Sequence, residues 1–390
     1  MDYSKIINKS IAALKPSGIR QFFDIVASTP DVISLGVGEP DFVTPWGIRE
    51  AAIKSVQKGF TQYTSNSGIP VLREEIAGFL SERYALNYNA ADEILITVGA
   101  SEAIDLTLRT LIETGDEVLI PDPSYVSYAP NVLITGGVPK IVATSATDGF
   151  KLTPSALEAA ITPRTKVIML SYPNNPTGAV MTKAELEGIR KVIAKTNAMV
   201  ISDEIYAELT YGDEPHASIA ALDKMRERTV VISGFSKAFA MTGWRVGYVA
   251  APKEITAAMT KIHQYTIMCA PTASQYAAIA ALKEGRADGY KAVCDMRSQY
   301  DMRRRYLVKS LNDMGLSCFE PKGAFYAFPS VKSTGLDGAE FATRLLKSQK
   351  VAVVPGEAFG ESGKLHVRCC YATSMRNIEE AASRIGKFLR

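Results

Sequence analysis

Short apolar runs alternate with stretches of helical periodicity through the middle of the chain. Residues 167–171 are mostly apolar, and the stretch 184–195 carries Leu186, Ile189 and Ile193 on one helical face. A helix is also expected over 101–113, and the runs expected to form strands are 93–98, 117–120, 138–143, 167–171, 199–202, 230–233 and 246–250. Apolar strands separated by helices predict an α/β fold, in which a mostly parallel sheet is flanked by helices on both faces.

The pattern changes after residue 286, where a long charged helix is expected over 287–314. The shorter elements expected beyond it are strands at 324–328, 351–354 and 366–370 and an amphipathic helix at 374–389. We therefore predict a large α/β domain over residues 46–286. Residues 1–45 and 287–390 are expected to form a smaller α+β domain.

The composition excludes some classes of protein but does not indicate a function. The chain has 390 residues, 47% of them hydrophobic and 22% charged, and these are ordinary proportions for a globular protein of two or three domains. The 44 Lys and Arg residues against 41 Asp and Glu residues give a net charge of +3, without a basic block. A nucleic-acid partner is therefore not expected.

Cysteine and histidine spacing gives no sign of a metal site. Five cysteines include no Cys-x-x-Cys pair, and the three histidines lie far apart in the sequence. The apolar run 11–14 is too short for a signal peptide, and no run approaches the ~18 apolar residues of a membrane span. We therefore expect a cytoplasmic protein with no membrane partner.

Polar side chains follow several of the predicted strands directly. The segments after the strand ends are 99–103, 172–178, 203–206, 234–237 and 243–247. Each has a simple structural explanation when taken alone, such as a helix cap, a turn or a surface lysine. Because sites in open α/β sheets lie beyond the carboxyl ends of the strands, their gathering at one edge favours a binding site.

The same segments carry the motifs of a known family, in the same order along the chain. The motifs are GVGEPDF at 36–42, Tyr63 followed by GIPVLR at 68–73, NNPTG at 174–178, DEIY at 203–206, SKAFAMTGWRVG at 236–247 and Val-Arg at 367–368. The chain resembles class I pyridoxal-phosphate (PLP) aminotransferases over nearly its whole length. It is most similar to the branch that holds bacterial aspartate, aromatic and N-acetyl-diaminopimelate aminotransferases. The resemblance implies the PLP transferase fold of type I.

The resemblance implies the roles of the reacting groups. Lys237 is expected to form a Schiff base with pyridoxal 5'-phosphate and to carry the proton between the substrate Cα and the cofactor. Asp203 is expected to hold the pyridine nitrogen protonated, since a nearby carboxylate favours the charged ring. Tyr206 and Asn175 match the residues that hydrogen-bond the phenolic oxygen of the cofactor.

The cofactor phosphate needs N–H donors, a hydroxyl and positive charge. The residues expected to supply them are Ala100, Ser101, Ser236 and Arg245. Relatives often carry a serine where this chain has Gly234, so Ser236, or in second place Ser233, is expected to take over that contact. Tyr125 matches the aromatic residue that stacks on the cofactor ring.

Substrate contacts are implied in the same way. Arg368 matches the bidentate arginine for the α-carboxylate of the amino acid, and Gly38 matches a backbone contact to it, with Tyr125 and Asn175 beside them. Tyr63 matches a residue that relatives lend to the neighbouring subunit's phosphate, which implies a homodimer. His263 and Tyr265 lie near a predicted helix end, where packing is a stronger interpretation than a substrate role.

Three hypotheses follow for the function. The first is an aminotransferase that moves an amino group from an L-amino acid to a 2-oxo acid, expected to be 2-oxoglutarate, by a ping-pong mechanism. The second is a PLP-dependent C–S lyase or a related β-eliminating enzyme, and the third is a binding protein without catalysis. The donor stays open among aspartate, glutamate, aromatic and diaminopimelate-type amino acids.

Overall fold

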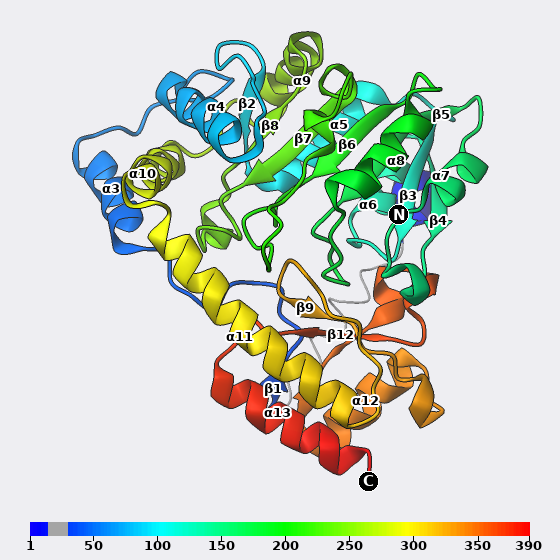
Figure 1. The fold of residues 1–390 in the computed structure, drawn as a ribbon. Helices are drawn as coiled ribbons and strands as arrows, with labels where there is room; N and C mark the ends of the chain where they lie inside the picture. Colours follow the sequence, from blue (N-terminus) through cyan, green and yellow to red (C-terminus); the bar gives the residue numbers. More distant parts are fainter. Residues whose placement is uncertain (15–29) are drawn as a thin grey trace.

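The computed structural model describes residues 1–14 and 30–390, and its centre is a seven-stranded sheet (Figure 1). The strand order is β2 (Ile94–Thr97), β8 (Gly247–Ala250), β7 (Thr229–Gly234), β6 (Met199–Asp203), β5 (Thr165–Ser171), β3 (Glu117–Asp122) and β4 (Val138–Ala143). Within this sheet, β8 alone runs against the other strands. The prediction of a mostly parallel sheet in an α/β fold is confirmed.

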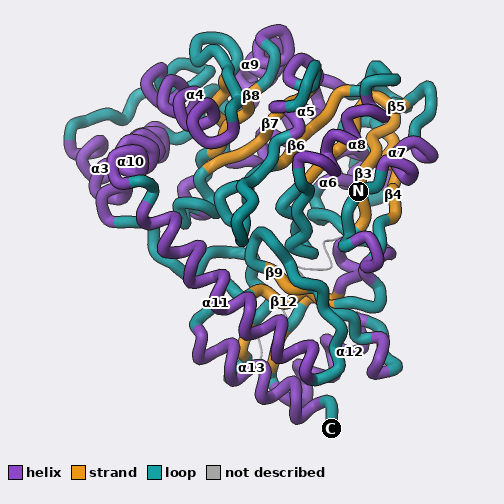
Figure 2. The backbone as a smooth tube through the Cα atoms, in the orientation of Figure 1, coloured by secondary structure: helices purple, strands orange, loops and turns teal. Residues whose placement is uncertain are grey.

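Helices cover both faces of this sheet (Figure 2). In β5, Val167 and Met169 pack against one helical layer, whereas Ile168 and Leu170 pack against the other. The first layer contains α5 (Gly99–Leu111), α6 (Tyr128–Ile134) and α9 (Lys253–Thr266). The second contains α7 (Pro154–Ala160) and α8 (Lys183–Ile193), with α3 (Trp46–Gln57), α4 (Pro70–Tyr84) and α10 (Thr272–Asp288) beyond them. The alternation follows from the period of two in a strand.

The remaining part of the chain builds two small sheets. Strand β1 (Ile33–Ser34) pairs in parallel with β10 (Val351–Ala352), so the first strand lies beside one near the end of the chain. The second sheet has the order β11 (Val354–Pro355), β12 (Val367–Cys370) and β9 (Tyr326–Ala327). The helices packed on them are α11 (Lys291–Asp313), α12 (Gly338–Gln349) and α13 (Met375–Phe388).

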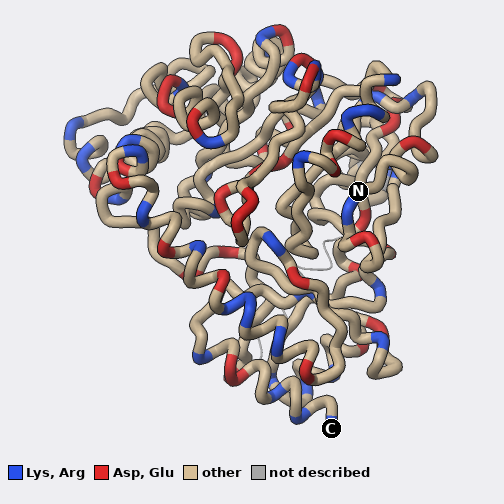
Figure 3. The backbone as a smooth tube through the Cα atoms, in the orientation of Figure 1, with Lys and Arg blue, Asp and Glu red and all other residues tan. Residues whose placement is uncertain are grey.

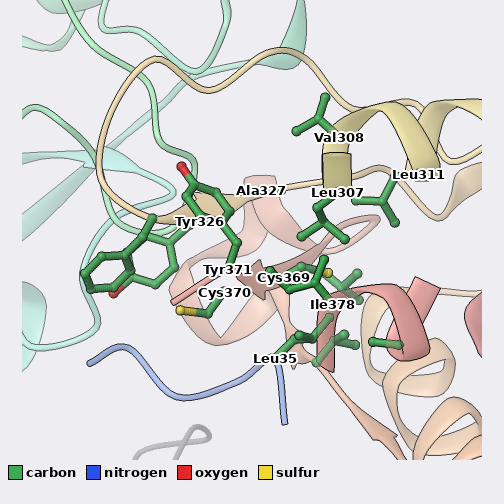
Figure 4. Packing of buried hydrophobic residues seen from close by; sticks show 14 of the residues in the cluster. Leu35, Leu307, Val308, Leu311, Tyr326, Ala327, Cys369, Cys370, Tyr371 and Ile378 are labelled. Atoms are coloured by element: carbon green, nitrogen blue, oxygen red, sulfur yellow. The ribbon is translucent and has the colours of Figure 1, made fainter. Parts of the chain in front are cut away.

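Figure 4 shows the apolar core of this part, where Leu35 packs near Leu307 and Ile378. Residues from both ends of the chain thus share one core, which supports grouping them in one domain. The division at residues 46 and 286 stays a prediction.

The remaining helical elements in the described part of the chain are short. They are α1 (Lys9–Ala12) and the 3-10 helices η1 (Tyr3–Lys5), η2 (Ala146–Asp148), η3 (Ile219–Ala221), η4 (Arg226–Arg228), η5 (Thr242–Trp244), η6 (Lys332–Thr334), η7 (Gly356–Phe359) and η8 (Glu361–Gly363).

Lys and Arg positions are interspersed with Asp and Glu along the chain (Figure 3). Within residues 1–14 and 30–390, no helix is both long and apolar enough to cross a membrane.

Several expected elements differ in extent from the observed ones. The charged helix begins at Lys291 rather than 287, because Gly289 and Tyr290 adopt left-handed conformations with φ of 72° and 58° that separate it from α10. The strand expected at 324–328 is shortened to two residues after Ala324, whose φ is 56°. The run 351–354 divides between two sheets. Gly289 is a signal for the first of these breaks, since glycine is common just after a helix, whereas Tyr290 and Ala324 are unusual residues for left-handed positions.

Candidate active site

One cavity of about 550 Å³ lies at the carboxyl ends of β5, β6 and β7, beside the start of α5. Strands β9 and β12 contribute Tyr326 and Arg368 from the opposite side. The residues predicted from the sequence that line it are Gly38, Ala100, Ser101, Tyr125, Asn175, Asp203, Tyr206, Ser236, Lys237, Arg245 and Arg368. The structure therefore brings together, in a single chain, all of the predicted site residues except Tyr63.

Lys237 follows β7 and extends its amine into the cavity. Its Nζ donates a hydrogen bond to the backbone oxygen of Gly38 over 2.7 Å, and it lies 5.7 Å from the ring centroids of Tyr206 and Phe325. Burial lowers the pKa of Lys237 to about 8, although Glu39 acts in the opposite direction. The site thus favours a free amine, which is the nucleophilic form.

Asp203 ends β6 and is almost fully buried. Its Oδ2 accepts a hydrogen bond from the Tyr128 hydroxyl over 2.8 Å, and its Oδ1 accepts one from the backbone N–H of Ile205 over 3.2 Å. Burial raises the pKa of Asp203 to about 6, against the effect of these two hydrogen bonds. A cationic ring nitrogen beside this carboxylate would favour its ionised form.

A tyrosine pair closes the cavity on the side of β9. The hydroxyls of Tyr206 and Tyr326 lie 2.7 Å apart, and both rings are buried. Gly38 lies against this pair, since a Cβ atom there would be 2.7 Å from the Tyr326 hydroxyl. A side chain at position 38 would therefore displace Tyr326, which explains the glycine without any unusual backbone angle.

Arg368 lies on β12 and is 3% exposed. Its Nη1 donates to Oδ1 of Asn175 over 2.8 Å, and its Nη2 donates to the backbone oxygen of Gly36 over 2.6 Å. Its Nε is buried with no hydrogen-bond partner among the described residues. The guanidinium lines the cavity and is fixed by these two hydrogen bonds, so it is suited to donate to a carboxylate ligand there.

The start of α5 forms an anion-binding end of the cavity. In the described residues, the backbone N–H groups of 99–101 and the Ser236 hydroxyl have no acceptor. Arg245 lies against this turn, since a Cβ at Gly99 would be 2.7 Å from its Nη2. Free N–H groups, a helix dipole and a guanidinium together fit a phosphate group.

These groups match the parts of pyridoxal phosphate one by one. The phosphate fits the start of α5, the ring nitrogen fits the buried Asp203 carboxylate, and the aldehyde fits the Lys237 amine. Tyr125 lines the same cavity and offers an aromatic face. The donor set of this cavity is therefore suited to PLP.

Some predicted alternatives lie elsewhere. Ser233 directs its hydroxyl to the backbone oxygen of Glu204 over 3.3 Å and does not line the cavity, so Ser236 is the serine that faces it. Tyr63 is 79% exposed and does not line the cavity of its own chain. His263 is completely buried behind α5, and Tyr265 is 86% exposed, so neither lines the cavity.

Four residues that are not predicted as site residues from the sequence also line the cavity, namely Tyr128, Tyr326, Ser171 and Glu39. Tyr128 stands three residues after Tyr125 and begins α6, so the spacing that places both rings in one turn was a usable signal. Tyr326 lies in a strand that the sequence predicts, but nothing in the sequence indicates that this strand meets Gly38.

Gly247, in β8, packs closely against the anion-binding turn at residues 99–101. A Cβ atom at Gly247 would lie 2.8 Å from both the backbone nitrogen of Ala100 and the carbonyl carbon of Gly99. We expect Gly247→Ala to lower the free energy of unfolding by about 1–3 kcal/mol, as overpacking does, and to weaken the binding of inorganic phosphate. At Gly243 a Cβ would meet nothing within 4 Å, so Gly243→Ala should unfold like the wild type in urea. Equal urea midpoints for the two variants would contradict the prediction.

Comparisons with known proteins indicate one family. Residues 30–385 match the family model for aminotransferases of class I and II. The putative aminotransferase YugH of Bacillus subtilis is 53% identical over 379 residues, which cover 97% of each chain. An aspartate aminotransferase of Pyrococcus abyssi is 47% identical over 97% of this chain and 96% of its own. A solved aromatic aminotransferase from Pyrococcus horikoshii OT3 is 45% identical and superimposes with a TM-score of 0.90 over 95% of this chain and 98% of its own.

The family match and these relatives extend over nearly the whole length of the chain. They confirm the type I fold, the dependence on PLP and the aminotransferase activity that the motifs predicted, and they give the lyase alternative no support. The chain belongs to the class I and II aminotransferases, enzymes that use pyridoxal phosphate to transfer amino groups.

Proposed function

We propose that the chain transfers the amino group of an L-amino acid to 2-oxoglutarate in two half-reactions, with Lys237 as the proton carrier. The observation that carries the proposal is the convergence of the Lys237 amine, the Asp203 carboxylate and the Arg368 guanidinium on one cavity. When bound, PLP supplies the aldehyde that takes up the amino group and the ring that holds the electrons released at Cα.

The chain's own residues bind and orient the substrate. Arg368, which lines the cavity, binds the α-carboxylate, while Asn175 holds the same guanidinium in place. Lys237 Nζ takes the proton from Cα and returns it to the carbon that accepts it in the second step. Asp203 keeps the ring nitrogen protonated from a position fixed by Tyr128.

Incubation with single amino acids, without any oxo acid, tests this proposal. PLP-loaded protein should release one equivalent of 2-oxo acid per site and form pyridoxamine phosphate with donors chosen from aspartate, glutamate, aromatic and diaminopimelate-type amino acids. Lys237→Ala should do neither. Arg368→Lys should keep the cofactor while kcat/KM falls about a hundredfold, because lysine cannot form the bidentate contact. Continuous release of pyruvate and ammonia instead would overturn the proposal.

The pKa of Lys237 predicts a pH dependence for cofactor capture. Since that pKa is lowered to about 8, the fraction of free amine should rise about tenfold per pH unit below pH 8 and then level off. Only the free amine attacks an aldehyde, so the rate of covalent PLP attachment to PLP-free protein should follow this curve in a stopped-flow experiment. A rate that keeps rising towards pH 10 would indicate an ordinary lysine.

We also propose a homodimer in which Tyr63 reaches the neighbouring site. The segment that holds Tyr63 is bonded to the turn before α10, through Asn66 to Met268 and Thr272 to Gln62. Large apolar side chains are exposed around it, namely Phe60, Tyr63, Tyr265, Ile267 and Met268. A second copy of the chain would bury this patch.

Sedimentation equilibrium tests the dimer. The wild type should have the mass of two chains, and Tyr63→Ala should retain that mass but hold PLP more weakly. A wild-type mass of one chain would contradict the arrangement. The cytoplasmic location stays a prediction from the sequence.

A further inference from the structure

The first turn of α5 already has a carboxylate beside it, that of Glu102. Its Oε2 accepts the backbone N–H of Val98, the residue just before the helix, and its Oε1 lies 2.8 Å from Nδ1 of His263. Since a carboxylate oxygen only accepts hydrogen bonds, His263 is the donor. Both oxygens of Glu102 are therefore held on the side of the helix that faces α9.

This carboxylate is a potential competitor for the anion-binding turn. The N–H groups of residues 99–101 have no acceptor within the described ranges and belong to the same turn from which Glu102 extends. A negative side chain in the first turn is attracted by those N–H groups and by the helix dipole. Ala100 and Ser101 line the cavity, whereas Glu102 does not, so the present arrangement leaves the turn open to a ligand.

His263 is not explained by packing alone. It is completely buried in the last turn of α9, and its Nε2 has no hydrogen-bond partner in the described part of the chain. An apolar residue would fill this position without leaving a buried polar atom unpaired. The side-chain hydrogen bond that the imidazole does make is the one to Glu102.

We propose that His263 is a positioning residue for the cofactor phosphate. It holds the Glu102 carboxylate against Val98 and so keeps the N–H groups of residues 99–101 available to the phosphate. His263 acts through Glu102 and touches neither cofactor nor substrate. The inference rests on the proposed placement of PLP in this cavity.

Comparing PLP with pyridoxal, which lacks the phosphate, isolates this effect. PLP-free, full-length protein is titrated with each compound. His263→Leu should raise the Kd for PLP about tenfold, because the released carboxylate competes for the N–H groups, and should leave the Kd for pyridoxal unchanged. His263→Asn keeps a donor near the place of Nδ1 and should bind PLP like the wild type.

A second substitution separates competition from packing. Adding Glu102→Ala to His263→Leu removes the competitor, so the double variant should recover the wild-type Kd for PLP. A double variant that stays weak, or an equal loss of PLP and pyridoxal affinity, would overturn the proposal. Thermal melts check folding, and His263→Met, which also lacks the donor, replaces the leucine variant if that one does not fold. Wild-type protein that binds neither compound would instead refute the proposed function.

Discussion

The removal of ionisable groups from water is the constraint on which the active site depends. Burial is the largest influence on both reacting groups, and it shifts them in opposite directions, lowering the pKa of Lys237 to about 8 and raising that of Asp203 to about 6. Both pKa shifts show that burial destabilises the charged form, which is the ammonium of Lys237 and the carboxylate of Asp203. The cavity thus holds an amine and a carboxylate whose charged forms are disfavoured. A cationic ring nitrogen would stabilise the Asp203 carboxylate, and an aldehyde would react with the neutral amine of Lys237.

The sheet explains how such groups can be buried at all. Strands β6 and β7 are neighbours, and their carboxyl ends deliver Asp203 and Lys237 into the same space without needing long loops. The cations Arg245 and Arg368 approach from different elements and lower the pKa of Lys237 further. The burial that makes Lys237 reactive therefore also lowers the stability of the folded chain. The surrounding apolar clusters supply the stabilisation that offsets the cost of these buried charges.

Much of this arrangement could be predicted from the sequence, because strand ends follow a local pattern. Lys237, Asp203 and Asn175 each follow an apolar run within a few residues, and a parallel sheet gathers such positions at one edge. Contacts between distant segments have no such signal. The meeting of Tyr326 with Gly38 depends on how β9 packs, and the pair formed by Glu102 and His263 depends on the angle between α5 and α9. Helix breaks such as Gly289–Tyr290 were missed because Tyr290 is an unusual residue for a left-handed position.

The pairing of β1 with β10 has a consequence for the order in which the enzyme becomes complete. Residues 37 and 38 line the cavity as one of its walls, and the backbone oxygens of Gly36 and Gly38 accept hydrogen bonds from Arg368 and Lys237. The strand that precedes them is held by residues near the end of the chain, namely 350–352 and Cys370. During synthesis the sheet with Lys237 can assemble while the last residues are still on the ribosome, since domains fold as units from the N-terminus. The wall cannot. A nascent chain that ends before β10 therefore lacks both this wall and Arg368, so the burial that lowers the pKa of Lys237 is incomplete. The catalytic centre is completed only when the last residues of the chain have folded.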